Sequence, residues 1–238
     1  MSYYSKLTQM AKTGEDKVIM DCACGGGRGL KHLRTLKPKE LIGADISSKF
    51  LNRCIKENEQ MLLEDSPFTK LMVADVRDLK YKDYFDYFYC CETLEYLKPE
   101  DNTQAMKSIV QAIKPKGKLL ISVPGHEDSI ENTNHLQVFT SDILKELFGR
   151  ACVLLKEDTW IKYPSHETKG HHHNILMVFQ KREKRGVVQK PRPMIKFVMN
   201  KFRDIPLIGA EIGVKAGKNA YSMLTYLNME CLYLIDSW

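Results

Sequence analysis

The 238-residue sequence contains no uninterrupted apolar run that approaches the roughly 18 residues needed to span a bilayer. Its first residues, MSYYSKLTQMAKTGEDK, lack the basic and then apolar pattern of a secretory signal. Its seven cysteines are odd in number, and Cys22, Cys24, Cys90 and Cys91 fall in or beside apolar runs. These absences argue against a membrane-spanning or disulfide-rich secreted protein, and they predict a cytoplasmic protein without a membrane span.

Metal-site and phosphate-loop patterns are also missing. Cys22 and Cys24 have CxC spacing with no matching histidine pair, so we expect buried thiols and no metal. No GxxxxGK[ST] phosphate loop occurs. The run of His171, His172 and His173 could converge on an ion in a loop, but no carboxylate follows nearby, and a solvent-exposed loop is the preferred interpretation.

The net charge of +6 is concentrated in one short stretch. Residues 1–180 contain 25 basic and 25 acidic residues, whereas residues 181–203 contain nine basic residues and one acid. Gly186, Pro191 and Pro193 lie in that stretch, which predicts a basic linker between a domain at 1–180 and a segment at 204–238. The alternative is a surface for RNA, an anionic membrane or an acidic partner. The neutral first domain argues against nucleic acid as a partner.

Residues 17–180 alternate between strand-like and helix-like segments. Apolar strands are expected at 17–22, 40–46, 70–76, 84–92 and 118–124, with helices at 29–36, 47–64 and 102–117. Continuously apolar strands separated by helices predict an α/β fold with a parallel sheet that is covered on both faces. Ligands of such sheets bind at the carboxyl ends of the strands.

Three acids fall at successive strand ends around a glycine-rich turn. The turn is DCACGGGRG, in which Gly25, Gly27 and their neighbours let the backbone turn tightly and approach a ligand. Asp45 ends the second strand 24 positions after Asp21 and can accept two hydrogen bonds from ribose hydroxyls. Asp75 ends the third strand and can accept from an adenine amino group. Together they predict a nucleoside pocket.

The stretch from about 17 to 180 resembles the class I S-adenosylmethionine-dependent methyltransferases. MDCACGGGRG is similar to that family's first motif, with Ala23 in place of the usual first glycine. IGADIS, VADVRDL, FDYFYCCETLEYL and HLQVFTSDILKELF resemble its following motifs in the same order. The resemblance implies a Rossmann-like, doubly wound sheet, mostly parallel with an antiparallel last strand, and S-adenosyl-L-methionine as cofactor.

The resemblance also implies roles for particular residues. The glycine turn would contact the cofactor, Asp45 and Ile46 would lie at the ribose, Asp75 and Val76 at the adenine, and Cys91 near the transferred methyl group. The cofactor-binding residues so implied are Asp21, Ala23, Gly25, Gly27, Asp45, Ile46, Asp75, Val76 and Cys91.

Candidates for a catalytic base are Glu92, His126 and His135. Methyl transfer from a sulfonium depends mainly on alignment, and a base is needed only when the acceptor loses its proton late. His126 lies in a loop after the fifth strand, where catalysis and a structural role are equally open. His135 is placed by the HLQVFT pattern, for which docking of the loop is the preferred interpretation.

The tail at 204–238 repeats the plan of the first motif. Glu211 takes the place of Asp21, Gly213 that of Ala23, Gly217 lies in the turn, and Asp236 follows 25 positions after Glu211. EIGVKAGKNAYSML resembles the first motif of a group that includes antibiotic-sugar O-methyltransferases. We therefore expect a truncated second methyltransferase domain that does not bind cofactor, and the alternative is an appendage docked on the first domain.

The sequence thus predicts a methyltransferase that acts on a small molecule, with a sugar or glycan hydroxyl preferred because of the tail. An RNA-associated methyltransferase or nucleic-acid-binding protein that uses residues 181–203 is the alternative. An NAD-dependent oxidoreductase is disfavoured, because DCACGGG lacks the GxGxxG spacing. The sequence gives no indication of an oligomeric state.

Overall fold

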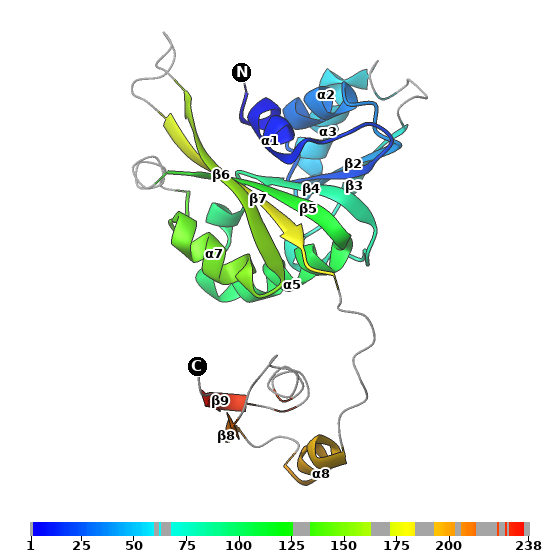
Figure 1. The fold of residues 1–238 in the computed structure, drawn as a ribbon. Coiled ribbons are helices and arrows are strands. Elements are labelled where there is room, and N and C mark those ends of the chain that lie inside the picture. The colour runs from blue at the N-terminus through cyan, green and yellow to red at the C-terminus, as the bar shows by residue number, and fades with distance from the viewer. Residues whose placement is uncertain are drawn as a thin grey trace. The chain divides into compact units, whose positions relative to one another are not determined.

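A computed structural model describes residues 2–59, 62, 68–125, 134–162, 172–183, 193–202, 206–212, 223, 227 and 229–235. The chain divides into two compact units, Met1–Glu183 and Lys184–Trp238 (Figure 1). The boundary lies three residues beyond the predicted end of the first domain, inside the stretch expected to be a linker. No helix in the described part of the chain is both long and apolar enough to cross a membrane.

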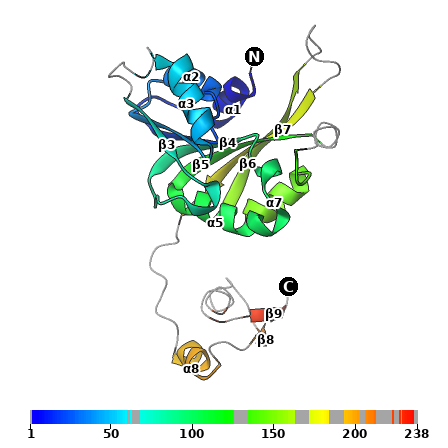
Figure 2. The same ribbon diagram turned by 180° about the vertical axis from the view of Figure 1, so that it is seen from behind.

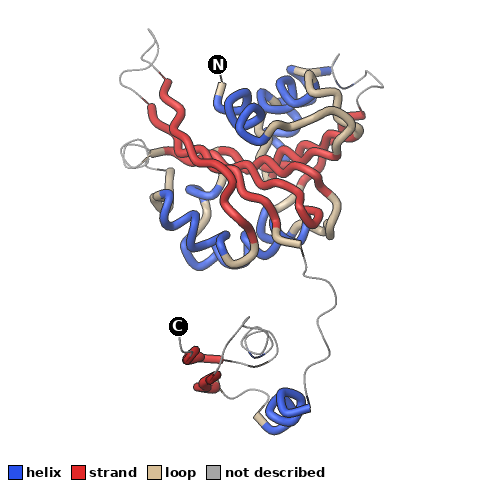
Figure 3. The backbone as a smooth tube through the Cα atoms, in the orientation of Figure 1, coloured by secondary structure: helices blue, strands red, loops and turns tan. Residues whose placement is uncertain are grey.

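The first unit is built on a seven-stranded sheet with the order β3-β2-β1-β4-β5-β7-β6. Figure 3 shows the strands of this sheet in red, between helices in blue. The five strands from β1 to β5 pair in parallel, whereas β7 is antiparallel to both β5 and β6. The strands are β1 (Val18–Cys22), β2 (Glu40–Asp45), β3 (Phe68–Val73), β4 (Phe85–Cys91), β5 (Ile113–Pro124), β6 (Cys152–Lys162) and β7 (His172–Lys181). This confirms the predicted Rossmann-like sheet, although β6 was not expected from the sequence.

Helices cover both faces of this sheet (Figures 1 and 2). On one face lie α1 (Tyr3–Ala11), α2 (Arg28–Arg34) and α3 (Ser48–Glu57), and on the other lie α5 (Asn102–Ala112) and α7 (Ser141–Gly149). Side chains of a strand alternate between faces, so Ile19 packs in the core under α1 and α2 while Met20 packs in the core under α5 and α7. Two apolar cores therefore hold the central strands rigidly.

Short polar side chains fix where the helices begin. Ser2, Ser47 and Thr140 each accept a hydrogen bond from a backbone N–H in the first turn of α1, α3 and α7. The helix expected at 47–64 ends at Glu57 as α3, and most residues from 60 to 67 lie outside the described part. The fifth strand begins at Ile113, so Pro115 and Gly117 lie in β5 rather than at a helix end.

The second unit contains α8 (Pro193–Lys201), β8 (Leu207–Ile212) and β9 (Met229–Ile235). The two strands pair in parallel, from Leu207 with Met229 to Ile212 with Ile235. Glu211 lies in β8, whereas Gly213, Gly217 and Asp236 are outside the described residues. The second methyltransferase domain at 204–238 therefore stays a prediction.

Candidate functional site

A pocket of about 710 Å³ opens at the carboxyl ends of β1 to β4 in the first unit. Its walls come from the loops after these four strands and from the segment around 134–136. The lining residues are Cys22, Ala23, Gly25, Asp45, Ile46, Phe50, Ala74, Asp75, Val76, Arg77, Glu92, Thr93, Tyr96, Leu97, Lys98, Asp101, Asn134 and Leu136. Six of the nine predicted cofactor-binding residues line this one pocket, and Asp21, Gly27 and Cys91 do not.

The glycine-rich turn forms the wall next to β1. Ala23 and Gly25 both adopt positive φ angles, 59° and 53°, a conformation that costs an alanine more than a glycine. Gly27 has a different task, because a Cβ atom there would lie 2.6 Å from the Sγ atom of Cys54 in α3. Gly27 therefore allows close packing of the turn against α3, and it does not line the pocket.

The carboxylate of Asp45 is fixed by two backbone donors. The N–H of Gly25 donates to its Oδ2 at 2.9 Å, and the N–H of Ser47 donates to its Oδ1 at 2.9 Å. Asp45 thus links the turn after β1 to the start of α3. Ile46, beside it, is 63% exposed, which is unusual for an isoleucine next to a buried strand. An apolar side chain held open beside a fixed carboxylate suits a ligand with a flat face and hydroxyl groups.

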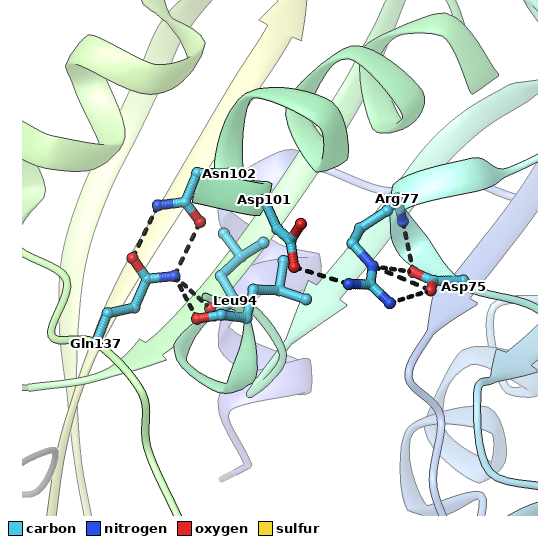
Figure 4. A network of polar contacts seen from close by, with 7 residues as sticks. Asp75, Arg77, Leu94, Asp101, Asn102 and Gln137 are labelled. Carbon is cyan, nitrogen blue, oxygen red and sulfur yellow. Dashed lines mark hydrogen bonds and ion pairs between the residues drawn. The ribbon is translucent and has the colours of Figure 1, made fainter. Parts of the chain in front are cut away.

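Asp75 is held by Arg77 (Figure 4). The guanidinium donates from Nε to both carboxylate oxygens at 3.0 Å and from Nη2 to Oδ2 at 2.6 Å. Its Nη1 donates to Oδ2 of Asp101 at 2.7 Å. The hydrogen bonds from Arg77 hold the pKa of Asp75 below its ordinary value. Arg77 thereby joins the end of β3 to the start of α5 across one wall of the pocket.

Gln137 holds a second part of the site in place (Figure 4). Its Nε2 donates to the backbone carbonyls of Leu94 and Leu97 at 3.0 and 2.9 Å. It also exchanges side-chain hydrogen bonds of 2.8 and 2.9 Å with Asn102, the first residue of α5. The segment that carries Asn134 and Leu136 is therefore tied to the loop after β4.

Glu92 stands at the end of β4 with a φ angle of 51°, which is uncommon for a residue with a side chain. Its Oε1 accepts hydrogen bonds from Oγ of Ser122, at 2.8 Å, and from Nδ2 of Asn174. Ser122 and Asn174 are buried in β5 and β7. A strained backbone and two buried donors thus fix a carboxylate in the pocket wall.

Glu95, three residues later, is completely buried, and neither carboxyl oxygen has a hydrogen-bond partner among the described residues. Burial, followed by the charge of Glu92, raises its pKa to about 8. Glu95 is therefore mostly protonated at neutral pH. The sequence offers one signal for it, an acid within the partly apolar run CCETLEYL.

Asp21 and Cys91 lie behind the lining residues, inside the sheet. Both are buried, at 0% and 3% exposure. Oδ1 of Asp21 accepts a hydrogen bond of 2.7 Å from the hydroxyl of Tyr4 in α1. Burial raises the pKa of Asp21 to about 7, although this hydrogen bond lowers it and the charge of Asp45 raises it further. The contact with Tyr4 had no signal in the sequence.

The three candidate bases have different places. Glu92 lines the pocket. His135 lies between the lining residues Asn134 and Leu136, and its ring meets the ring of Tyr96 edge-on with centroids 5.0 Å apart. His126 lies outside the described residues. The structure therefore brings Glu92 and the neighbourhood of His135 to one pocket.

Comparison with known proteins identifies the kind of domain in the first unit. A family described as a methyltransferase domain matches residues 20–121, which contain the glycine turn, Asp45, Asp75 and Glu92. The chain carries a class I S-adenosylmethionine-dependent methyltransferase domain. S-adenosylmethionine is the cofactor of this methyltransferase domain. The alternative of an NAD-dependent oxidoreductase is thereby set aside.

Two curated relatives match parts of the methyltransferase domain. A carboxy-S-adenosyl-L-methionine synthase from Shewanella loihica is 31% identical over 107 residues, 44% of this chain and 43% of the relative. A tRNA U34 carboxymethyltransferase from Helicobacter pylori is 28% identical over 121 residues, 48% of this chain and 43% of the relative. The matches thus span less than half of either relative.

Solved structures share the fold of the methyltransferase domain. The N-methyltransferase NodS from Bradyrhizobium japonicum aligns with a TM-score of 0.62 and 15% identity, over 76% of this chain and 94% of that chain. A putative methyltransferase from Bacillus halodurans aligns with a TM-score of 0.64 and 13% identity, over 76% and 100% of the two chains. At such identities the likeness concerns the fold alone.

Proposed function

We propose that this chain transfers the methyl group of S-adenosylmethionine to a small-molecule acceptor bound beside Glu92. The observation that carries the proposal is the order of three carboxylates along one pocket, Asp75 after β3, Asp45 at the end of β2 and Glu92 after β4. In that order the adenine lies at Asp75, the ribose hydroxyls bind Asp45, and the sulfonium lies over the turn after β1. The methyl group then faces Glu92.

The order of the three carboxylates also indicates what the other residues of the site do. Ala23 and Gly25 let the backbone approach the cofactor, and Ile46 and Val76 pack against its rings. Arg77 keeps the carboxylate of Asp75 in a fixed orientation through its paired hydrogen bonds. Gly27 and Cys91 support the turn and the strand end from behind the pocket.

Alignment supplies much of the catalysis, because the sulfonium is already a good leaving group. Glu92 is placed to accept the proton of an acceptor hydroxyl, since Ser122 and Asn174 fix its Oε1. A sugar or glycan hydroxyl is the acceptor that the resemblance of the tail favours. Tyr96 and Leu136, which are 47% and 54% exposed in the pocket wall, offer apolar surface for the face of a sugar ring.

Calorimetric titration with S-adenosylhomocysteine tests the cofactor assignment. We expect one site per chain and a Kd that rises at least about tenfold in Asp45→Asn, because the variant loses a charged acceptor. Asp78→Asn is the matched control, since Asp78 is exposed and does not line the pocket. Absence of binding by the folded wild-type chain, or equal affinities in the two variants, would contradict the assignment.

The acceptor is tested with S-adenosylmethionine carrying a labelled methyl group and a panel of small hydroxyl and amine compounds. Glu92→Gln is the informative variant, because it keeps the shape of the side chain and removes the base. We expect turnover on the true acceptor to fall about a hundredfold while S-adenosylhomocysteine still binds. Unchanged turnover would remove Glu92 as the base.

An RNA acceptor is the second candidate, and one observation favours it: one relative is named as a tRNA carboxymethyltransferase. The basic residues of 181–203 would then hold the phosphate backbone. Retention of tRNA that falls steeply with salt and disappears when the lysines and arginines of 181–203 are replaced by glutamine would support this candidate. Weak retention that the replacement leaves unchanged would leave the small-molecule acceptor.

A further inference from the structure

The first helix is joined to the end of β1 by a buried hydrogen bond. The hydroxyl of Tyr4 donates to Oδ1 of Asp21 at 2.7 Å, and Tyr4 is only 8% exposed. Its ring stacks on that of Tyr89 in β4, with centroids 5.9 Å apart. Oδ2 of Asp21 has no hydrogen-bond partner among the described residues. One oxygen of this buried carboxyl is thus positioned by α1, and the other is left without a donor.

This carboxyl lies at one particular end of the cofactor. Asp75 and Asp45 place the adenosine over β3 and β2, and the sheet order continues from β2 to β1 and then β4. The amino-acid part of the cofactor therefore extends over the ends of β1 and β4. Asp21 is fully buried and immediately precedes the lining residues Cys22 and Ala23 at that end. An ammonium group bound there feels the charge of Asp21 through a medium of low dielectric constant.

We propose that Tyr4 is a positioning residue of the cofactor site, whose hydroxyl orients Asp21 and stabilises its negative charge beneath the ammonium group of the cofactor's amino-acid part. The inference rests on the proposed function, and it makes α1 a part of the site. The bond from a neutral hydroxyl favours the ionised form of the carboxyl that accepts it. Tyr4 thus acts through Asp21 and does not touch the reacting atoms.

Cofactor binding then depends on pH. Burial raises the pKa of Asp21 to about 7, the hydrogen bond from Tyr4 lowers it, and the charge of Asp45 raises it. The other titratable groups that interact electrostatically with Asp21 are Tyr3 and Tyr4 in α1, Cys22 and Cys24 at the end of β1, Cys54 in α3, and Tyr89, Cys90 and Cys91 in β4. None of these groups becomes a cation. Below about pH 7 Asp21 gains a proton, and its attraction for the ammonium group is lost.

Two ligands separate this role from a purely structural one. S-adenosylhomocysteine carries the ammonium group, whereas methylthioadenosine has the same adenosine part without the amino acid. We expect Tyr4→Phe to raise the Kd of S-adenosylhomocysteine about tenfold at pH 7 and to leave the Kd of methylthioadenosine within about twofold. The pH at which S-adenosylhomocysteine affinity falls to half should move upward in Tyr4→Phe.

Tyr87→Phe is the matched control. The hydroxyl of Tyr87 also reaches the end of α1, where it donates at 3.4 Å to the carbonyl of Lys12, the residue after the helix, but it does not contact Asp21. Asp21→Asn is the second variant, which removes the charge itself and decides the question if Tyr4→Phe does not fold. Either variant supports the inference by weakening S-adenosylhomocysteine alone.

Three results would overturn the inference. Equal weakening of both ligands would make Tyr4 a structural residue, as would affinities that match those of Tyr87→Phe. An S-adenosylhomocysteine affinity that does not change between pH 6 and 8 would remove the charge of Asp21 from binding. Failure of the wild-type chain to bind either ligand would instead overturn the proposed function, and the inference with it.

Discussion

Replacing the buried Glu95 with glutamine should stabilise the protein increasingly as the pH rises. The folded state holds this carboxyl in its neutral form, because it is fully buried, has no hydrogen-bond partner among the described residues and lies near the charge of Glu92. Its pKa rises from 4.5 to about 8 on folding. The stability that Glu95 contributes is complete below pH 4.5 and is lost as the pH rises through 8.

The size of the effect follows from the two pKa values. Their difference corresponds to at most about 5 kcal/mol of unfolding free energy between pH 4.5 and 8, with a slope of at most about 1.4 kcal/mol per pH unit. Glutamine has nearly the same shape and cannot ionise, so the Glu95→Gln variant loses none of this unfolding free energy as the pH rises. Because Glu92 and Glu95 interact, the titration belongs to the pair, and the slope observed is that of the pair.

Urea unfolding followed by circular dichroism at pH 5, 6, 7 and 8 provides the measurement. The difference in unfolding free energy between Glu95→Gln and wild type should grow steadily over this range, whatever packing cost the amide adds at pH 5. The exposed Glu100, replaced by glutamine in the same way, is the control and should give a nearly constant difference. A constant difference for Glu95→Gln as well would refute the argument that this site holds a proton.

Other replacements test separate features of the fold. Gly29→Ala should destabilise by about 3 kcal/mol or more, because its Cβ would lie 2.3 Å from the Tyr4 ring. Gly149→Ala should be neutral or stabilising by a few tenths of a kcal/mol, because apart from the adjoining backbone its Cβ would meet no described atom within 4 Å. Urea unfolding compares the two variants. Arg77→Met should lower the Tm more than Arg53→Met, since the pair of Arg53 with Glu57 within α3 is exposed. Equal decreases of the Tm in calorimetry would contradict this. Lys181→Met should lower the free energy of unfolding by about 2 kcal/mol, because the buried ammonium donates to a backbone carbonyl and to a carboxylate. An unchanged midpoint of urea unfolding would refute that.

Apolar periodicity predicted the parallel strands well. The runs ending at Cys22, Asp45 and Cys91 contain enough buried side chains to specify central strands, and sequence order with right-handed crossovers then limits their arrangement. The strand β6 was not predicted, because it lies at an edge of the sheet, where it pairs with β7, and carries charged residues. Edge strands have a weaker apolar signal, since one side faces solvent.

Acids at strand ends could be read from the sequence, whereas their partners could not. Asp45 and Asp75 follow their strands directly, and parallel strands bring such positions to one edge of the sheet. Arg77 could be placed near Asp75 by sequence distance alone, but its second bond, to Asp101, depends on how α5 packs. Tyr4 contacts Asp21 only because α1 crosses the sheet, which no local pattern specifies.

The attachment of α1 also has a consequence for synthesis on the ribosome. Lys6 in α1 forms an ion pair with Asp158 and donates to the carbonyl of Thr159, both in β6. At about 5–20 residues per second, β6 is made on the order of ten to thirty seconds after α1. During that interval Tyr4 and Leu7 have no complete sheet to cover, so α1 completes its contacts only after β6 is made. Mutations that slow translation between α1 and β6 would prolong the exposure of this apolar helix to chaperones and proteases.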